Sequence, residues 1–92
     1  MRKVKKGIIH IFKNGIFVTI RKIIYIRRQE KFLKYYYDKS TLFEAIKLGE
    51  KIVKMVPLDL YNYQKLARAY WKNNEDNKAI KTLRRGLKVN YN

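Results

Sequence analysis

A self-similarity at an offset of 34 residues constrains the fold of this 92-residue chain more than any other feature. The segment EAIKLGEKIVKMVP at 44–57 aligns with KAIKTLRRGLKVNY at 78–91, so that Ala45 falls on Ala79. One period earlier, HIFKNG at 10–15 aligns with the start of the first of these segments. A fixed period of this length indicates stacked supersecondary units, each of which buries its apolar face against the next.

Turn-forming residues divide the chain into helical segments. Apolar residues recur at helical spacing almost throughout, and no stretch sustains the alternation that is typical of a strand. The interruptions are YDKST at 37–41, VPLDL at 56–60 and NNEDN at 73–77, with a weaker break near 22–26. The pattern therefore predicts an all-α fold of about five antiparallel helices, at 7–22, 25–37, 41–56, 59–73 and 77–90.

Capping residues agree with these boundaries. Thr41 and Glu44 have the spacing of a capping box, in which each side chain bonds the backbone N–H of the other residue. Asp59 follows the only Pro of the chain, which ends the preceding helix, and is the expected N-cap of the next one.

The last unit, 60–92, resembles the tetratricopeptide repeat (TPR), a helix-turn-helix unit of 34 residues. Its matching positions are Tyr63 (Trp in the family), Leu66, Ala67, Tyr70, Ala79, Leu83 and Gly86. The unit before it, 26–59, matches at Phe32, Leu33, Tyr36, Ala45 and Pro57. That unit departs from the pattern at Gly49, where the family has a large residue, and at Ile52, where it has a small one.

The resemblance implies a TPR-like α-solenoid of about two and a half repeats. Its parts are a basic tail at 1–6, a basic amphipathic helix at 7–25 that acts as a half-repeat or cap, and repeats at 26–59 and 60–92. Leu66, Tyr70, Ala79 and Leu83 are expected in the core. The alternative is a generic antiparallel bundle, which uses similar apolar stripes. Because three or more repeats are usually needed for stability, we expect a partner to cover the ends.

The chain is strongly basic, with 23 Lys and Arg against 7 Asp and Glu and a formal net charge of +16. An A/T-rich coding bias would favour Lys, but it would favour Asp and Glu as well, so it does not explain the scarcity of acids. A surplus of this size predicts nucleic acid, anionic lipid or acidic protein as the partner.

Stacked repeats bring residues 34 apart onto one face, where cations would form ladders able to follow RNA phosphates. The expected RNA- or anion-binding residues are Arg2, Lys3, Lys5, Lys6, Lys31, Lys65, Lys47, Lys51, Lys54, Lys81, Arg84, Arg85 and Lys88. The alternative is that these cations lie on ordinary solvated helix faces, where salt screens their repulsion.

A second candidate site follows from the resemblance alone. In the family, the first helix of each repeat lines a concave groove that holds peptides. The corresponding residues here are Arg27, Lys34, Tyr37, Tyr61, Gln64, Arg68, Trp71 and Lys72. Aromatic rings beside cations suit an acidic peptide or stacked bases with their phosphates. The carboxylate clamp of chaperone-binding members is expected to be absent, and Trp71 could instead pack against the turn.

The N-terminal helix has an apolar face of its own. Drawn as a helix, this face consists of Ile8, Ile9, Phe12, Ile16, Ile20, Ile23 and Ile24. Such a helix either lies on an anionic membrane or packs onto 25–37 and caps the solenoid. Charged and polar residues interrupt the segment too often for a transmembrane span.

Residues that carry chemistry are scarce. There is no Cys, and His10 is the only His, so the sequence predicts no metal site and no nucleophile activated by a neighbouring base. No catalytic motif or phosphate-binding glycine loop is present, and we expect no enzyme, cofactor or small-molecule substrate.

The sequence thus predicts a non-enzymatic basic adaptor, a structural subunit of a larger assembly such as a ribosome or other ribonucleoprotein. It would contact RNA phosphates and neighbouring protein subunits. The alternative is a membrane-complex adaptor that lies on anionic lipid through 7–26 and binds a protein in the groove. With no secretory cleavage site, the expected location is intracellular, in the cytoplasm or an organelle interior.

Overall fold

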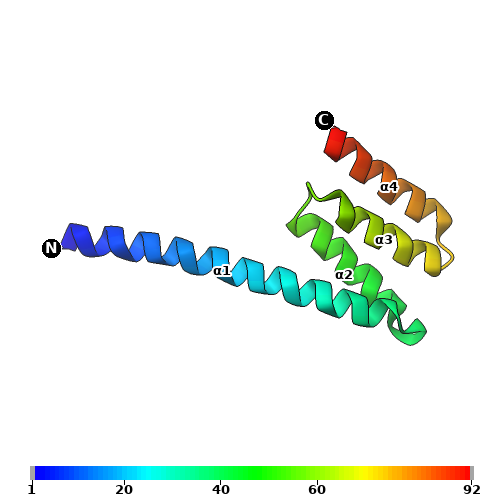
Figure 1. Cartoon of the computed structure of the whole chain (residues 1–92), viewed down its shortest axis with the longest axis horizontal. Coiled ribbons are helices and arrows are strands. Elements are labelled where there is room, and N and C mark those ends of the chain that lie inside the picture. The colour runs from blue at the N-terminus through cyan, green and yellow to red at the C-terminus, as the bar shows by residue number, and fades with distance from the viewer. Residues whose placement is uncertain (1, 92) are drawn as a thin grey trace.

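A computed structural model describes the backbone of residues 2–91 and the side chains of residues 15–89. Over this range the chain has four α-helices and no strand, which confirms the all-α class (Figure 1). They are α1 (Arg2–Tyr36), α2 (Leu42–Met55), α3 (Leu60–Lys72) and α4 (Asp76–Tyr91). A short 3₁₀ turn, η1 (Lys39–Thr41), joins α1 to α2. Because α2 begins at 42 and α4 at 76, the second helices of the two hairpins start 34 residues apart.

The prediction of five helices was wrong at the break expected near 22–26, since α1 runs through it without interruption. The sequence IRKIIYI contains neither Pro nor Gly, so nothing removes a backbone hydrogen bond there. Side chains on both sides of that point also hold the helix to the body, with Arg21 and Arg28 both contacting Met55. The helix begins at Arg2 and so includes residues 2–6, where a basic tail was expected.

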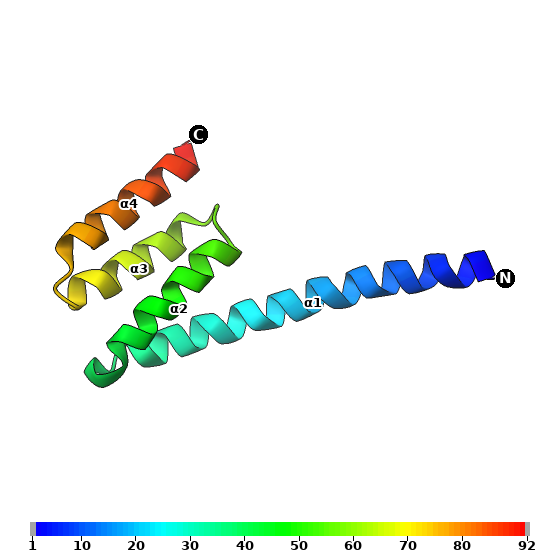
Figure 2. The ribbon, with the colours of Figure 1, turned by 180° about the vertical axis from the view of Figure 1, so that it is seen from behind.

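The first part of α1 projects from the other helices, while its last third packs beside α2 (Figures 1 and 2). Helices α2, α3 and α4 then follow one another antiparallel in chain order. The molecule measures 61 × 34 × 13 Å, and its radius of gyration is 17.5 Å. A compact chain of this length would have a radius of about 12 Å. The projecting helix therefore dominates the shape.

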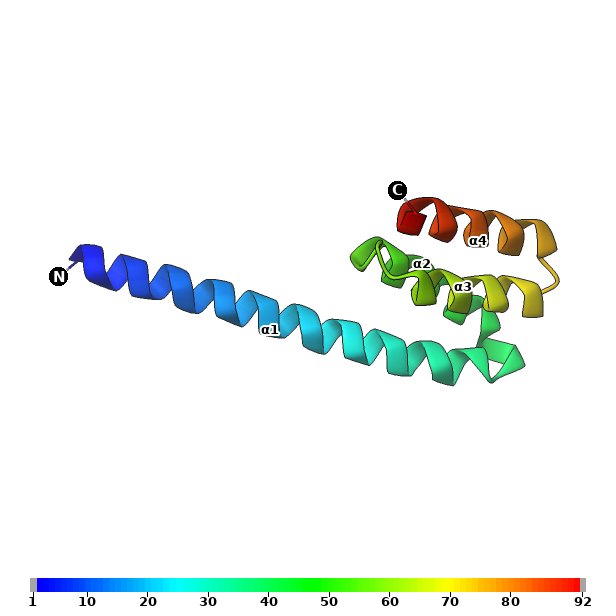
Figure 3. The same cartoon turned by 45° about the horizontal axis from the view of Figure 1, so that its top comes forward.

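Because α1 is one continuous helix, the apolar face of the N-terminal segment does not fold back onto 25–37, as one of the two expected alternatives required. Figure 3 shows this part of α1 clear of the body. Its described isoleucines, including Ile16, Ile20 and Ile23, are exposed. One continuous helix cannot also turn back on itself. The side chains of Ile8, Ile9, Phe12 and His10, and those of Arg2, Lys3, Lys5 and Lys6, lie outside the described residues.

The core lies between the last third of α1 and helices α2 and α3. Its buried residues are Phe32, Leu42, Ala45, Ile46, Ile52, Val53, Tyr63, Leu66 and Ala69. Residues 34 apart share burial, since Phe32 and Leu66 are both buried, as are Ala45 and Ala79. Leu83 is 39% exposed, against the prediction of a core position, because no described helix covers the outer face of α4. Tyr70 is half-buried.

Two glycines allow the helices to approach closely. A Cβ at Gly49 would lie 2.9 Å from Leu66 Cδ1, and one at Gly86 would lie 2.7 Å from Tyr63 Cβ. Gly49 is therefore a contact of α2 with α3, and Gly86 the corresponding contact of α4 with α3. The departure from the repeat pattern at Gly49 thus has a packing reason in this chain.

One predicted cap is confirmed and the other is not. The Asp59 carboxylate accepts a hydrogen bond from the Tyr61 backbone N–H at 3.0 Å, as an N-cap should. Thr41 makes no side-chain cap bond; its Oγ1 donates to the Tyr35 carbonyl at 3.0 Å. The turn before it is held instead by Asp38, which accepts from Ser40 N and Oγ. Thr41 therefore ties α1 to α2 rather than closing a capping box.

Candidate functional site

Cations and aromatic rings gather where α1 ends beside α3. A cavity of about 380 Å³ is lined by Tyr36, Arg68, Trp71 and Lys72. Lys72 Nζ donates to the Tyr36 carbonyl at 2.6 Å and lies 4.4 Å from the centroid of the Tyr36 ring. An ammonium at this place neutralises the negative end of the α1 dipole. Trp71 is 69% exposed, so it does not pack into the turn.

The structure brings together part of the predicted groove. Lys72 Nζ is also 5.6 Å from the Tyr37 ring centroid, so Tyr37 joins Arg68, Trp71 and Lys72. Tyr36 belongs to the same cluster but was missed, because the resemblance assigned it to packing. Tyr61 and Gln64 are exposed on α3, and Arg27 and Lys34 are exposed on α1. Nothing in the described contacts joins those four residues to the cluster.

Lysines from three helices line a second cavity of about 590 Å³. They are Lys31 of α1, Lys47, Lys51 and Lys54 of α2, and Lys78 of α4. Four of these were predicted to bind anions. The prediction did not include Lys78, whose counterpart 34 positions earlier is the acid Glu44.

Three carboxylates share this cavity, namely Glu44, Glu50 and Glu75. Glu75 pairs with Lys78 at 3.0 Å, and Glu50 pairs with Arg85 at 3.5 Å. Hydrogen bonds from Asn73 and then from Lys78 lower the pKa of Glu75. These two ion pairs are the ones formed among the described side chains. Lys31, Lys47, Lys51 and Lys54 therefore form no ion pair with a carboxylate of the described residues.

Tyr70 fixes the position of Glu50. Its hydroxyl donates to Glu50 Oε1 at 2.8 Å. Burial, and next the hydrogen bond to Glu50, raise the pKa of Tyr70 to about 12. The hydroxyl therefore remains a donor at neutral pH and holds this carboxylate at the edge of the lysine cavity.

Lys65 lies inside the interface between α1 and α3. Its Nζ donates to Gln29 Oε1 at 2.8 Å and lies 4.7 Å from the centroid of the Tyr61 ring. Gln29 Nε2 donates in turn to the amide of Asn62, which is buried and also bonds Tyr25. Burial lowers the pKa of Lys65, and the charge of Asp59 partly opposes this. Lys65 thus takes part in a polar network that joins two helices.

The remaining predicted cations of α4, Lys81, Arg84 and Lys88, are exposed. Arg85 is turned toward Glu50 and lies 5.7 Å from the centroid of the Tyr63 ring. The predicted pairs Lys31–Lys65 and Lys51–Arg85 therefore each combine one cation that forms no ion pair among the described residues with one that has an internal partner.

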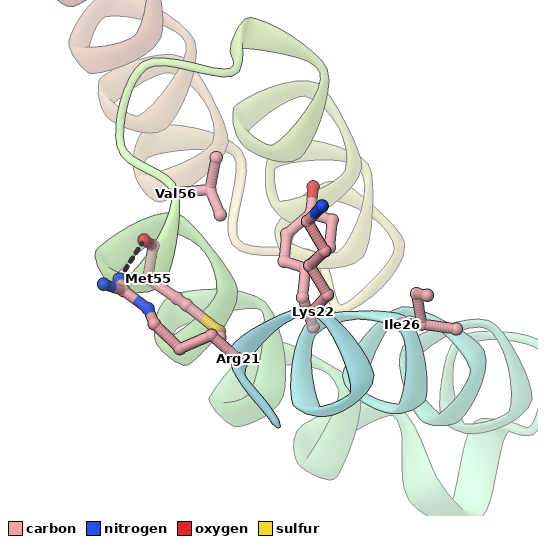
Figure 4. Close-up of a pocket in the computed structure, with 6 residues that line it drawn as sticks. Arg21, Lys22, Ile26, Met55 and Val56 are labelled. Carbon is pink, nitrogen blue, oxygen red and sulfur yellow. Dashed lines mark hydrogen bonds between the residues drawn. The ribbon is translucent and has the colours of Figure 1, made fainter. Parts of the chain in front are cut away.

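A third cavity, of about 380 Å³, lies where α1 leaves the body. Its lining is Arg21, Lys22, Tyr25, Ile26, Met55 and Val56. Figure 4 shows the Arg21 guanidinium turned to the Met55 carbonyl, to which Nη2 donates at 3.5 Å. The sequence did not indicate this cavity, because Met55 and Val56 lie at and just after the end of α2, about 30 residues further along the chain.

A comparison of the chain with protein families, with curated proteins and with solved structures finds no match. Within the described residues, no three His, Cys, Asp or Glu side chains gather in a way that could hold a metal ion. No helix in that range has the length and apolar character that crossing a membrane requires. The candidate site is therefore defined by cations and aromatic rings.

Proposed function

We propose that this protein is a non-enzymatic, TPR-like basic adaptor, a structural subunit of a ribonucleoprotein such as a ribosome. It contacts RNA phosphates through the lysine face, defined as Lys31, Lys47, Lys51 and Lys54. Neighbouring protein subunits meet the cluster of Tyr37, Arg68, Trp71 and Lys72.

The observation that carries the proposal is the imbalance over residues 15–89, where 18 Lys and Arg and 7 Asp and Glu form two ion pairs among the described side chains. Unneutralised cations at close range repel one another, and an anion relieves that repulsion. Each phosphate contact also releases counterions from the nucleic acid, which gives binding without any particular sequence.

The arrangement of the lysine face favours a polyanion over a single small anion. Its lysines come from two helices and border a wide, open surface that also holds three carboxylates. A small anion is bound tightly only where several donors converge on one point. A phosphate backbone contacts cations that are spread along a surface, and the exposed α4 cations Lys81 and Lys88 extend that surface.

The test is a titration of the full chain against structured RNA at increasing salt. We expect binding at low salt that weakens steeply, with a slope proportional to the number of phosphates contacted. The double variant Lys47→Gln/Lys51→Gln removes two contacts and should lower the slope by about 1.4–1.8. The matched control Lys22→Gln/Lys39→Gln removes the same charge away from the lysine face and should leave the slope nearly unchanged.

Two results would overturn the proposal. The first is absence of binding at low salt, or binding that salt does not weaken. The second is an equal loss in both double variants, because that would make net charge alone responsible.

A further inference from the structure

The projecting part of α1 presents an apolar stripe that no described part of the chain covers. Ile16, Ile20, Ile23 and Ile24 have the spacing of one helix face, and each is more than one third exposed. Four aliphatic side chains on one face of one helix form a continuous apolar surface. Scattered apolar residues need no explanation, but an ordered stripe of this kind indicates an interaction site.

The stripe points away from the body. The body-facing side of α1 is marked by Tyr25 and Gln29, which bond Asn62 of α3, and by buried Phe32. These positions repeat at the helical spacing, and the stripe lies about half a turn from them. A flat surface can therefore contact the stripe without meeting α2, α3 or α4.

The same face becomes cationic further along α1. After Ile20 and Ile24, the next residues on this face at steps of three or four are Arg27, Lys31 and Lys34, and all three are exposed. Glu30 lies at the edge of this face and is exposed as well. The outer side of α1 thus consists of an apolar stretch over 16–24 followed by a basic stretch over 27–34. The cation Lys31 belongs both to this face and to the lysine face.

We propose that the outer face of α1 binds the interface of an anionic lipid bilayer, with the stripe among the acyl chains and Arg27, Lys31 and Lys34 at the phosphates. An amphipathic helix of this composition lies in the plane of the interface without crossing it. The inference goes beyond the proposed function and does not depend on it.

Charge and apolar surface together argue against two other occupants, a second copy of the chain and a nucleic acid. A second copy packed on this face would add its own Arg27, Lys31 and Lys34 to a face that already carries the same three cations, and residues 15–29 contain no acid. Like charges held together in this way oppose dimerisation. A nucleic acid would satisfy the cations but leave four isoleucines in water. An anionic bilayer offers acyl chains and phosphates together.

The test measures partition of the full chain into vesicles by flotation. Phosphatidylcholine vesicles are compared with vesicles in which about a third of the lipid is phosphatidylserine, since anionic lipid attracts basic segments. We expect binding to the anionic vesicles and much weaker binding to the neutral ones. Equal binding to both, or binding to neither, would overturn the proposal.

A pair of matched variants then tests the orientation. Ile20→Asp places a charge in the stripe and should lower partition into the vesicles about 10-fold or more. The reason is that it replaces an apolar side chain that would be buried among the acyl chains. Val18→Asp makes the same change of charge two positions away, on the opposite side of the helix, and should alter partition much less. Circular dichroism confirms folding of each variant, and Ile20→Ser repeats the test without a charge.

A second pair tests the basic stretch. Arg27→Gln/Lys34→Gln should weaken partition into anionic vesicles by about fivefold for each cation removed. Arg84→Gln/Lys88→Gln removes equal charge from α4 and should have little effect. Equal losses in Ile20→Asp and Val18→Asp, or in both cation pairs, count against the proposed face. A dimer that forms without lipid and is abolished by Ile20→Asp would assign the stripe to a second copy.

Discussion

Two stretches of α1, 15–24 and 25–36, belong to one helix but have opposite surroundings. Over 15–24, apolar side chains such as Ile20 and Phe17 are exposed on several sides. Over 25–36, Phe32 is 2% exposed, and Tyr25, Tyr35 and Tyr36 pack against the core. Both stretches are helical because backbone hydrogen bonds propagate along a helix once one part of it is formed. An apolar helix face therefore does not reveal whether its own chain buries it.

Truncation of one phenylalanine in each stretch tests this difference most strongly. Phe32→Ala should lower the free energy of unfolding by about 3–5 kcal/mol, because it leaves a cavity in the core. Phe17→Ala changes the same residue type on the same helix, where the ring is 63% exposed, and should cost less than about 0.5 kcal/mol. Urea unfolding followed by circular dichroism measures both. A large loss in Phe17→Ala would show that the projecting stretch is packed in solution.

Two glycine substitutions compare a tightly packed position in the body, Gly86, with an open position on the projecting part of α1, Gly15. Gly86→Ala should destabilise the protein by about 1–3 kcal/mol, because the new Cβ has no room beside Tyr63. At Gly15 a Cβ would meet nothing within 4 Å. Gly15→Ala should therefore leave stability unchanged or raise the helix content, since Ala favours a helix by about 1 kcal/mol over Gly. Thermal unfolding of the two variants checks this, and destabilisation by Gly15→Ala would contradict the exposed position.

The smallest expected effect concerns the Tyr70 hydroxyl, which keeps its proton to a higher pH in the folded chain than in the unfolded chain. Its pKa of about 12 in the folded chain exceeds the ordinary value of 10.0. The stability that this shift contributes is present below pH 10 and is lost as the pH rises toward 12. An ultraviolet titration should show one late tyrosinate that Tyr70→Phe removes. Tyr37→Phe, at a side chain 75% exposed, should leave it in place. Its persistence in Tyr70→Phe would contradict the assignment.

Features that act within one helical turn could be predicted from the sequence. Asp59 caps α3, and α2 ends just before Pro57, because both effects depend on neighbouring backbone groups. The groove residues were instead expected from the family resemblance alone, and three of them lie together for a local reason. Arg68, Trp71 and Lys72 have the spacing of one helix face, so they gather wherever that helix lies.

Contacts between distant segments could not be predicted in the same way. Lys65 bonds Gln29, 36 residues away, and Arg85 bonds Glu50, 35 residues away. Neither partner lies at the offset of 34 on which the cation ladders were built. The pairing of a flexible side chain depends on which acceptor the packing brings within its reach. Thr41 is a further example, because the Tyr35 carbonyl competes successfully with the local cap.

By itself, the sequence determined that this chain is helical, where most of its helices end, that it is strongly basic, and that Ala79 lies in the core. Only the tertiary structure decided that α1 is continuous, that its isoleucine stripe stays exposed, and which cations form ion pairs. Periodicity shows that a helix has an apolar face. Whether that face is buried depends on a second surface, and the position of that surface is set by the packing of the whole chain.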